Sequence, residues 1–148
     1  MAVALPAPAT LALVVRLAGI GQLLLVAASP AIPRVLGWRE EVARGVRPLT
    51  RQVFSTWAAY VWLTHMAFGL LSTFGARLLV DGSPLSGIVA AFIATWWGAR
   101  LVIQFTYFDR SATGQGALFK LAEVGLVSLF TSLAAVYGTV ALAAFGRS

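Results

Sequence analysis

Residues 118–145 read LFKLAEVGLVSLFTSLAAVYGTVALAAF, an apolar run that contains only two charged residues. About 20 helical residues are needed to cross a hydrocarbon core roughly 30 Å thick, so this run is long enough to span a membrane. Three further runs of similar character precede it in the chain. They cover approximately residues 10–28, 50–74 and 84–108. The sequence therefore predicts four transmembrane helices.

The composition agrees with a membrane-embedded chain. Of its 148 residues, 59% are hydrophobic and 11% are charged. The four predicted helices leave little sequence for anything besides short connections, and short connections favour antiparallel neighbours. We expect an all-α integral membrane protein, a four-helix up-down bundle that forms a single domain over residues 1–148 with no soluble domain attached.

The amino-acid composition excludes several classes of reactive centre. The chain has no cysteine, which excludes a disulfide relay, an iron-sulfur cluster, a thiolate nucleophile and a cysteine-based zinc site. Its single histidine, His65, cannot supply bis-histidine haem ligation or the usual histidine-rich metal cage. We therefore expect no metal and no cofactor.

Basic residues are distributed unequally between the predicted connections. Seven lie in or next to the first and third connections, namely Arg34, Arg39, Arg44, Arg47, Arg51, Arg110 and Lys120. The opposite side has two, Arg77 and Arg147. The positive-inside rule then places the first and third connections in the cytoplasm and both termini outside. Ten of the eleven basic residues are arginine, a bias typical of GC-rich bacterial genomes, so we expect a bacterial inner (cytoplasmic) membrane.

The first connection has the pattern of a short amphipathic helix over approximately residues 33–49. Its apolar face recurs at steps of three and four and consists of Val35, Trp38, Val42, Val46 and Leu49. Its basic face contains Arg34, Arg39, Arg44 and Arg47. Such a helix lies on a membrane surface, either as an anchor that orients the protein or as a binding site for anionic lipid headgroups or a partner. Because these charges lie at the membrane edge, we expect no nucleic-acid partner.

Two ionisable residues of the last two predicted helices have matching depths. If the connection between these helices is centred near residue 112, Arg100 and Glu123 lie at the same level. Because a lone charge in the membrane is costly, we expect them to form an ion pair. Either the pair simply locks the two helices together, or it lines a polar cavity open to the cytoplasm with Trp97, Gln104 and Tyr107. In such a cavity Glu123 would exchange protons or Arg100 would bind an anion.

A second pair of residues is predicted by the same reasoning for the first two helices. With their connection centred near residue 40, Arg16 and His65 share a level in the outer half of the membrane. Two adjacent cations would repel, which favours a neutral His65. His65 is then either hydrogen-bonded within the bundle or part of a proton relay, and Arg16 extends to the headgroups.

Helix boundaries follow from local signals. Asp81-Gly82 is a turn dipeptide, and Ser83 is the expected N-cap of a helix whose first residue is Pro84. Thr50 is the expected N-cap of the second long helix, with Pro48 ending whatever precedes it.

No stretch of the sequence carries a motif that names a reaction. The leading hypothesis is therefore an accessory, assembly or lipid-interacting component of a membrane complex. A carrier of small molecules, protons or lipids that uses Arg100 and Glu123, acting as a homo-oligomer, is the first alternative. A lipid-processing enzyme using His65, Glu123 or Asp109 is the second, although His65 is expected far from the other two residues.

Overall fold

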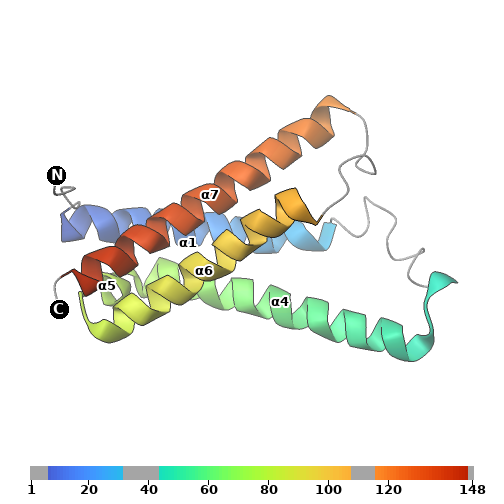
Figure 1. Cartoon of the computed structure of the whole chain (residues 1–148), viewed down its shortest axis with the longest axis horizontal. Coiled ribbons are helices and arrows are strands. Elements are labelled where there is room, and N and C mark those ends of the chain that lie inside the picture. The colour runs from blue at the N-terminus through green and yellow to red at the C-terminus, as the bar shows by residue number, and fades with distance from the viewer. Residues whose placement is uncertain (1–6, 32–43, 108–115, 147–148) are drawn as a thin grey trace.

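The computed structural model describes residues 7–31, 44–107 and 116–146, and the regular structure in these ranges is entirely helical. In chain order the elements are α1 (Pro8–Ala28), the 3₁₀ turn η1 (Ser29–Ala31), α4 (Pro48–Phe74), α5 (Ala76–Leu79), α6 (Pro84–Thr106) and α7 (Ala117–Phe145). The long helices alternate in direction (Figure 1). We call the end that holds the start of α1, α5 and the end of α7 the terminal end, and the opposite one the open end.

Three helical segments are long and apolar enough to cross a membrane. They are Pro8–Ala31, Pro84–Thr106 and Phe119–Phe145. These three segments identify a membrane protein. Helix α4 is also long, with 27 residues, but its first turns carry polar residues such as Arg51 and Gln52, and it is not among the three. The fourth predicted span stays a prediction.

The start of α6 confirms the predicted boundary. The hydroxyl of Ser83 accepts a hydrogen bond from the Ser86 amide at 3.1 Å, and Pro84 takes the first helical position, where its missing N–H is not needed. Gly82 has a φ of 81°, a conformation that glycine adopts without a steric penalty. Asp81 accepts a hydrogen bond from the Ser83 amide at 2.8 Å, which closes the turn.

The predicted N-cap of α4 was wrong by three residues. Helix α4 begins at Pro48, with Arg47 in the N-cap position, so Thr50 is inside the first turn. The physical reason is that proline is favourable at a first helical position, so Pro48 opens this helix instead of ending an earlier one. Leu49, expected at the end of the amphipathic segment 33–49, consequently belongs to α4, and residues 33–43 of that segment lie outside the described ranges.

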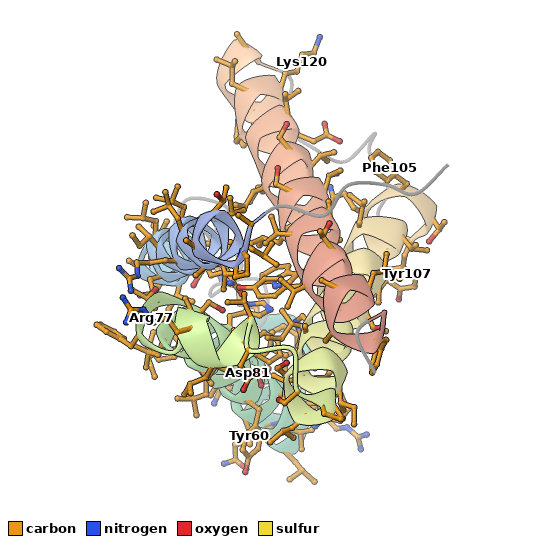
Figure 2. All side chains as sticks on the ribbon, turned by 90° about the vertical axis from the view of Figure 1, so that its left-hand side faces the viewer. Tyr60, Arg77, Asp81, Phe105, Tyr107 and Lys120 are labelled. Atoms are coloured by element: carbon orange, nitrogen blue, oxygen red, sulfur yellow. The ribbon has the colours of Figure 1, made fainter. Side chains whose placement is uncertain are left out.

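The buried core is concentrated toward the terminal end. Helix α4 buries only Phe68, Gly69 and Ser72, all in its last two turns, and the buried residues of α7 begin at Phe130. Residues 48–60 of α4 are all exposed. Figure 1 shows the reason, because α4 and α7 diverge toward the open end. Figure 2, which looks from the terminal end, places Lys120 at the far end of α7, away from the other helices.

Candidate functional site

One hydrogen-bonded cluster joins the four long helices at their centre. Gln22 of α1 donates through Nε2 to the Tyr137 hydroxyl of α7 at 2.6 Å. Its Oε1 accepts from the indole N–H of Trp97 on α6 at 3.1 Å. The hydroxyl of Ser72 on α4 shares a hydrogen bond with the same Tyr137 hydroxyl. We call these four residues the polar centre.

The polar centre is completely buried, with no exposed surface on any of its four side chains. A buried amide or hydroxyl without a partner costs about 1–3 kcal/mol. Here the groups satisfy one another, and Gln22 Nε2 makes an additional contact with the Ala18 carbonyl at 3.4 Å. In a membrane there is no hydrophobic driving force between helices, because the surrounding lipid is equally apolar. Interhelical hydrogen bonds of this kind then hold the helices together. The polar centre therefore fixes the arrangement of the four helices.

A stack of rings extends from the polar centre toward the open end. The ring of Trp97 lies between His65 and Phe130, with centroid distances of 4.7 Å and 5.3 Å and nearly parallel planes. Beyond Phe130, the guanidinium carbon of Arg100 lies 5.2 Å from the ring centroid, a cation-π contact. This aromatic stack connects residues of α4, α6 and α7.

His65 is held by α6. Its Nε2 accepts a hydrogen bond from the Trp96 indole N–H at 2.9 Å, and the Trp96 ring meets it edge-on. A ring nitrogen that accepts a hydrogen bond carries no proton, so this geometry corresponds to a neutral imidazole with its proton on Nδ1. The structure thus gives His65 the surroundings of a hydrogen-bonded bundle residue.

The residues predicted to line a cytoplasmic cavity are only partly brought together. Trp97 belongs to the polar centre, and Arg100 donates to Gln104 Oε1 at 3.2 Å while contacting Phe130. Tyr107, just past the end of α6, is 81% exposed. Glu123 is half-buried, about 10 Å along α7 from Phe130. The ion pair between Arg100 and Glu123 stays a prediction.

Helices α1 and α4 touch through small residues. A Cβ atom at Gly19 would lie 2.6 Å from the backbone nitrogen of Thr73 and 2.8 Å from Ser72 Cβ. One turn further toward the open end, a Cβ at Gly69 would lie 2.8 Å from the Leu23 side chain. Glycine at an interface of this kind lets two helix backbones approach closely. These contacts also fix the register of α1 against α4.

That register separates Arg16 from His65, so the shared depth predicted for them was wrong. Arg16 lies three residues before Gly19, which places it at the level of Arg77, four residues after Thr73. His65 lies about 15 Å away along the helix axis. The prediction took residue 40 as the midpoint between the helices, whereas the Gly19 contact puts it near residue 46. The cause is that α4 continues for several turns beyond the end of α1.

Two of the four arginines that were predicted to bind headgroups lie within the described ranges. Arg44 and Arg47 lie at the open end and are exposed, together with Arg51 in the first turn of α4. Arg34 and Arg39 lie outside the described residues. The basic part of the open end therefore adjoins the exposed first half of α4.

Sequence reasoning missed most of the polar centre. Tyr137 had one available signal, since a tyrosine in an apolar helix usually needs a partner for its hydroxyl. Ser72 had none, because serines in membrane helices also bond to their own backbone, as Ser132 does to the Ser128 carbonyl. No pattern in the sequence indicates that Phe130 contacts Arg100.

The chemistry of this arrangement is that of helix assembly. The Ser72 hydroxyl is bonded to Tyr137, and His65 is bonded to Trp96, so these two residues do not form a nucleophile-base pair. A hollow near the terminal end, lined by residues such as Leu11 and Leu79, has a volume of about 10 Å³, enough for roughly one water molecule. No family model, curated protein or solved structure matches this chain.

Proposed function

We propose that this protein is an accessory component of a membrane complex that binds anionic lipid headgroups at the cytoplasmic face. The observation that supports this proposal is the exposed first half of α4, residues 48–60, which combines Arg51 with large apolar side chains and directly follows Arg47. No other described helix buries it. A helix segment of this composition is suited to the boundary between lipid and water.

Four of the large apolar side chains of this segment form one stripe, and Phe54, 56% exposed, lies outside it. Leu49, Val53, Trp57 and Tyr60 follow one another at steps of four, four and three and are 50% to 71% exposed. Arg51 lies away from this stripe, toward the polar residues of the first turns. Figure 2 shows Tyr60 pointing outward from the bundle. The apolar stripe is available to acyl chains, and the arginines are available to headgroups.

The contacts between α4 and α6 indicate where the membrane boundary falls. Helices α4 and α6 run antiparallel (Figure 1), and the hydrogen bond from Trp96 to His65 places these two residues at one level. Trp57, two turns before His65, therefore reaches the level of the last turn of α6. Tyr107 follows that turn. Trp57 and Tyr107 are 70% and 81% exposed, as expected for an interfacial aromatic belt. The turns of α4 before Trp57 then enter the headgroup region.

The proposed topology follows from the same arrangement. All four long helices, α4 included, span the membrane, with both termini outside and the open end in the cytoplasm of a bacterial cell. The alternating helix directions and the seven-to-two distribution of basic residues support this orientation. Arg47 and Arg51 then face the leaflet whose anionic lipids attract each nearby basic residue by about 1 kcal/mol.

The proposal is tested by lipid titration of delipidated protein in mild detergent, followed by native mass spectrometry. We expect phosphatidylglycerol to bind more tightly than phosphatidylcholine. Arg47→Gln with Arg51→Gln should weaken phosphatidylglycerol binding about tenfold or more, because two attractions of about 1 kcal/mol are lost. The matched control, Arg47→Lys with Arg51→Lys, keeps the charges and should keep the preference.

Two outcomes would count against this function. One is phosphatidylglycerol binding by the double glutamine variant that equals the wild type. The other is a purified wild-type chain without any preference for phosphatidylglycerol. A stoichiometric partner protein that co-purifies from native membranes would then support the accessory role without the lipid-binding role.

A further inference from the structure

Arg16 and Arg77 lie at about the same level where α1 contacts α5. From the Gly19–Thr73 contact, three residues back along α1 lead to Arg16 and four residues forward lead to Arg77. Because the two segments are antiparallel, both steps run toward the terminal end and finish at the same level. Figure 2 shows Arg77 beside α1 at the end that faces the viewer.

Neither arginine is neutralised by the described part of the chain. Both are exposed, and neither takes part in a hydrogen bond or ion pair there. The nearest acidic residue in sequence, Asp81, accepts a hydrogen bond from the Ser83 amide. The other described acidic residue, Glu123, belongs to the first turns of α7 at the open end. Two neighbouring cations at one level, without a described counter-charge, repel one another.

The position of Arg16 along α1 increases the benefit of a bound anion, because the anion would neutralise a charge inside the hydrocarbon. Arg16 lies eight residues after Pro8, about 12 Å along a helix that is apolar enough to span the membrane. An unneutralised charge in hydrocarbon costs roughly 2.5–3.5 kcal/mol on insertion scales. The Cα–Cβ bonds of α1 tilt toward its N-terminus, so the Arg16 side chain starts toward the terminal-end surface.

We propose that Arg16 and Arg77 together bind the phosphodiester group of a phospholipid in the leaflet at the terminal end. Guanidinium groups bind phosphate oxygens through paired N–H donors, and one phosphate between two arginines removes their mutual repulsion. A lipid phosphate suits the site because both side chains lie on the outer surface of helices in the bilayer. This site is separate from the one proposed above, which uses Arg47 and Arg51 at the opposite end.

The test is a titration of the delipidated chain in detergent, read by native mass spectrometry. The four ligands are phosphatidylglycerol, phosphatidylcholine, diacylglycerol and inorganic phosphate. Both phospholipids should occupy the site, because both contain the phosphodiester. Diacylglycerol, which lacks it, should not. Inorganic phosphate should bind far more weakly than either lipid, because it has no acyl chains.

The variants are Arg16→Gln, Arg77→Gln and the double variant. Each single change should weaken phosphatidylcholine binding about tenfold, the effect of one lost charged hydrogen-bonding partner. The double variant should lose one bound lipid at saturation. The matched control is Lys120→Gln at the open end, which removes an exposed charge outside both proposed sites and should leave phosphatidylcholine binding unchanged. Failure of the phosphatidylglycerol preference at Arg47 and Arg51 would leave this site standing, so the two proposals fail separately.

Three results would overturn the site: wild-type lipid binding by the double variant, equal binding of diacylglycerol, or inorganic phosphate that competes as well as the lipids do. If the glutamine variants do not fold, judged by circular dichroism, Arg16→Lys with Arg77→Lys decides the question. Lysine keeps the charge but loses the paired donors, so binding should weaken several-fold. An unchanged affinity in the lysine variant would equally contradict the proposal.

Discussion

Gln22 and Tyr137 are 115 residues apart in the chain and share a 2.6 Å hydrogen bond at the centre of the four helices. The side-chain amide of Gln22 makes two interhelical hydrogen bonds. Its Nε2 donates to the Tyr137 hydroxyl, and its Oε1 accepts from the Trp97 indole N–H. The Tyr137 hydroxyl in turn contacts Ser72. Loss of any one of these groups therefore leaves a buried partner unsatisfied on another helix.

Tyr137→Phe should destabilise the protein by about 1–3 kcal/mol, because Gln22 and Ser72 each lose a buried partner. The measurement is the free energy of unfolding, or the apparent melting temperature, of purified protein in detergent. Tyr60→Phe is the matched control, since Tyr60 is 67% exposed, and it should have little effect. Equal stabilities of the two variants would show that the polar centre does not hold the helices together.

Gly19→Ala should destabilise the contact between α1 and α4. Its Cβ would lie 2.6 Å from the backbone nitrogen of Thr73, so the helices must separate, at a cost of about 1–3 kcal/mol for an overpacked core. At Gly125 a Cβ meets nothing within 4 Å, and Gly125→Ala should be neutral or slightly stabilising. Thermal unfolding in one detergent compares the two. A Gly19→Ala variant as stable as Gly125→Ala would contradict the register described for α1.

Arg100 and Glu123 should show coupled losses of stability. Removal of one partner of a buried ion pair strands the other charge and costs about 3–5 kcal/mol, whereas removal of both costs less. A double-mutant cycle with Arg100→Leu and Glu123→Leu measures the coupling. Phe130→Leu measures the cation-π contact of Arg100 together with the stacking of Phe130 on Trp97. Single losses that simply add would mean that the two residues do not interact.

Ionisation of Asp81 makes the stability of the fold depend weakly on pH in the acid range. Hydrogen bonds from the Ser83 amide, and then from the Ser83 and Ser86 hydroxyls, lower the pKa of its carboxyl group. A lowered folded-state pKa stabilises the fold above the unfolded-state value, near 4, and the effect disappears as the pH falls through the folded-state pKa. Asp81→Ala should therefore flatten the loss of melting temperature between about pH 5 and 3. An unchanged acid slope would show that the turn contributes nothing.

The sequence predicted the helices well because their signals are local. Apolar length located α1, α6 and α7, and the serine and proline at residues 83 and 84 located a boundary to the residue. Register was not predictable in this way, because it depends on how far α4 continues past α1. That distance follows from the contacts of Gly19 and Gly69, which no periodic pattern reveals.

The candidate site was predictable only in part for a related reason. Ionisable residues are rare in apolar helices, so the sequence alone singles out Arg16, His65 and Arg100. It does not identify their neighbours, because a pairing depends on register and on side-chain direction. The polar centre and the shared level of Arg16 and Arg77 both follow from contacts between helices distant in the sequence.

The most direct test concerns α4, whose passage through the membrane is central to the proposed function. Cysteine accessibility measures it, because the chain has no cysteine of its own. Gly45→Cys and Asp81→Cys place single thiols at exposed positions beyond the two ends of α4. With a membrane-impermeant maleimide on intact cells, we expect labelling of Asp81→Cys alone, and of both variants once the cells are permeabilised. Labelling of Gly45→Cys in intact cells would contradict the account.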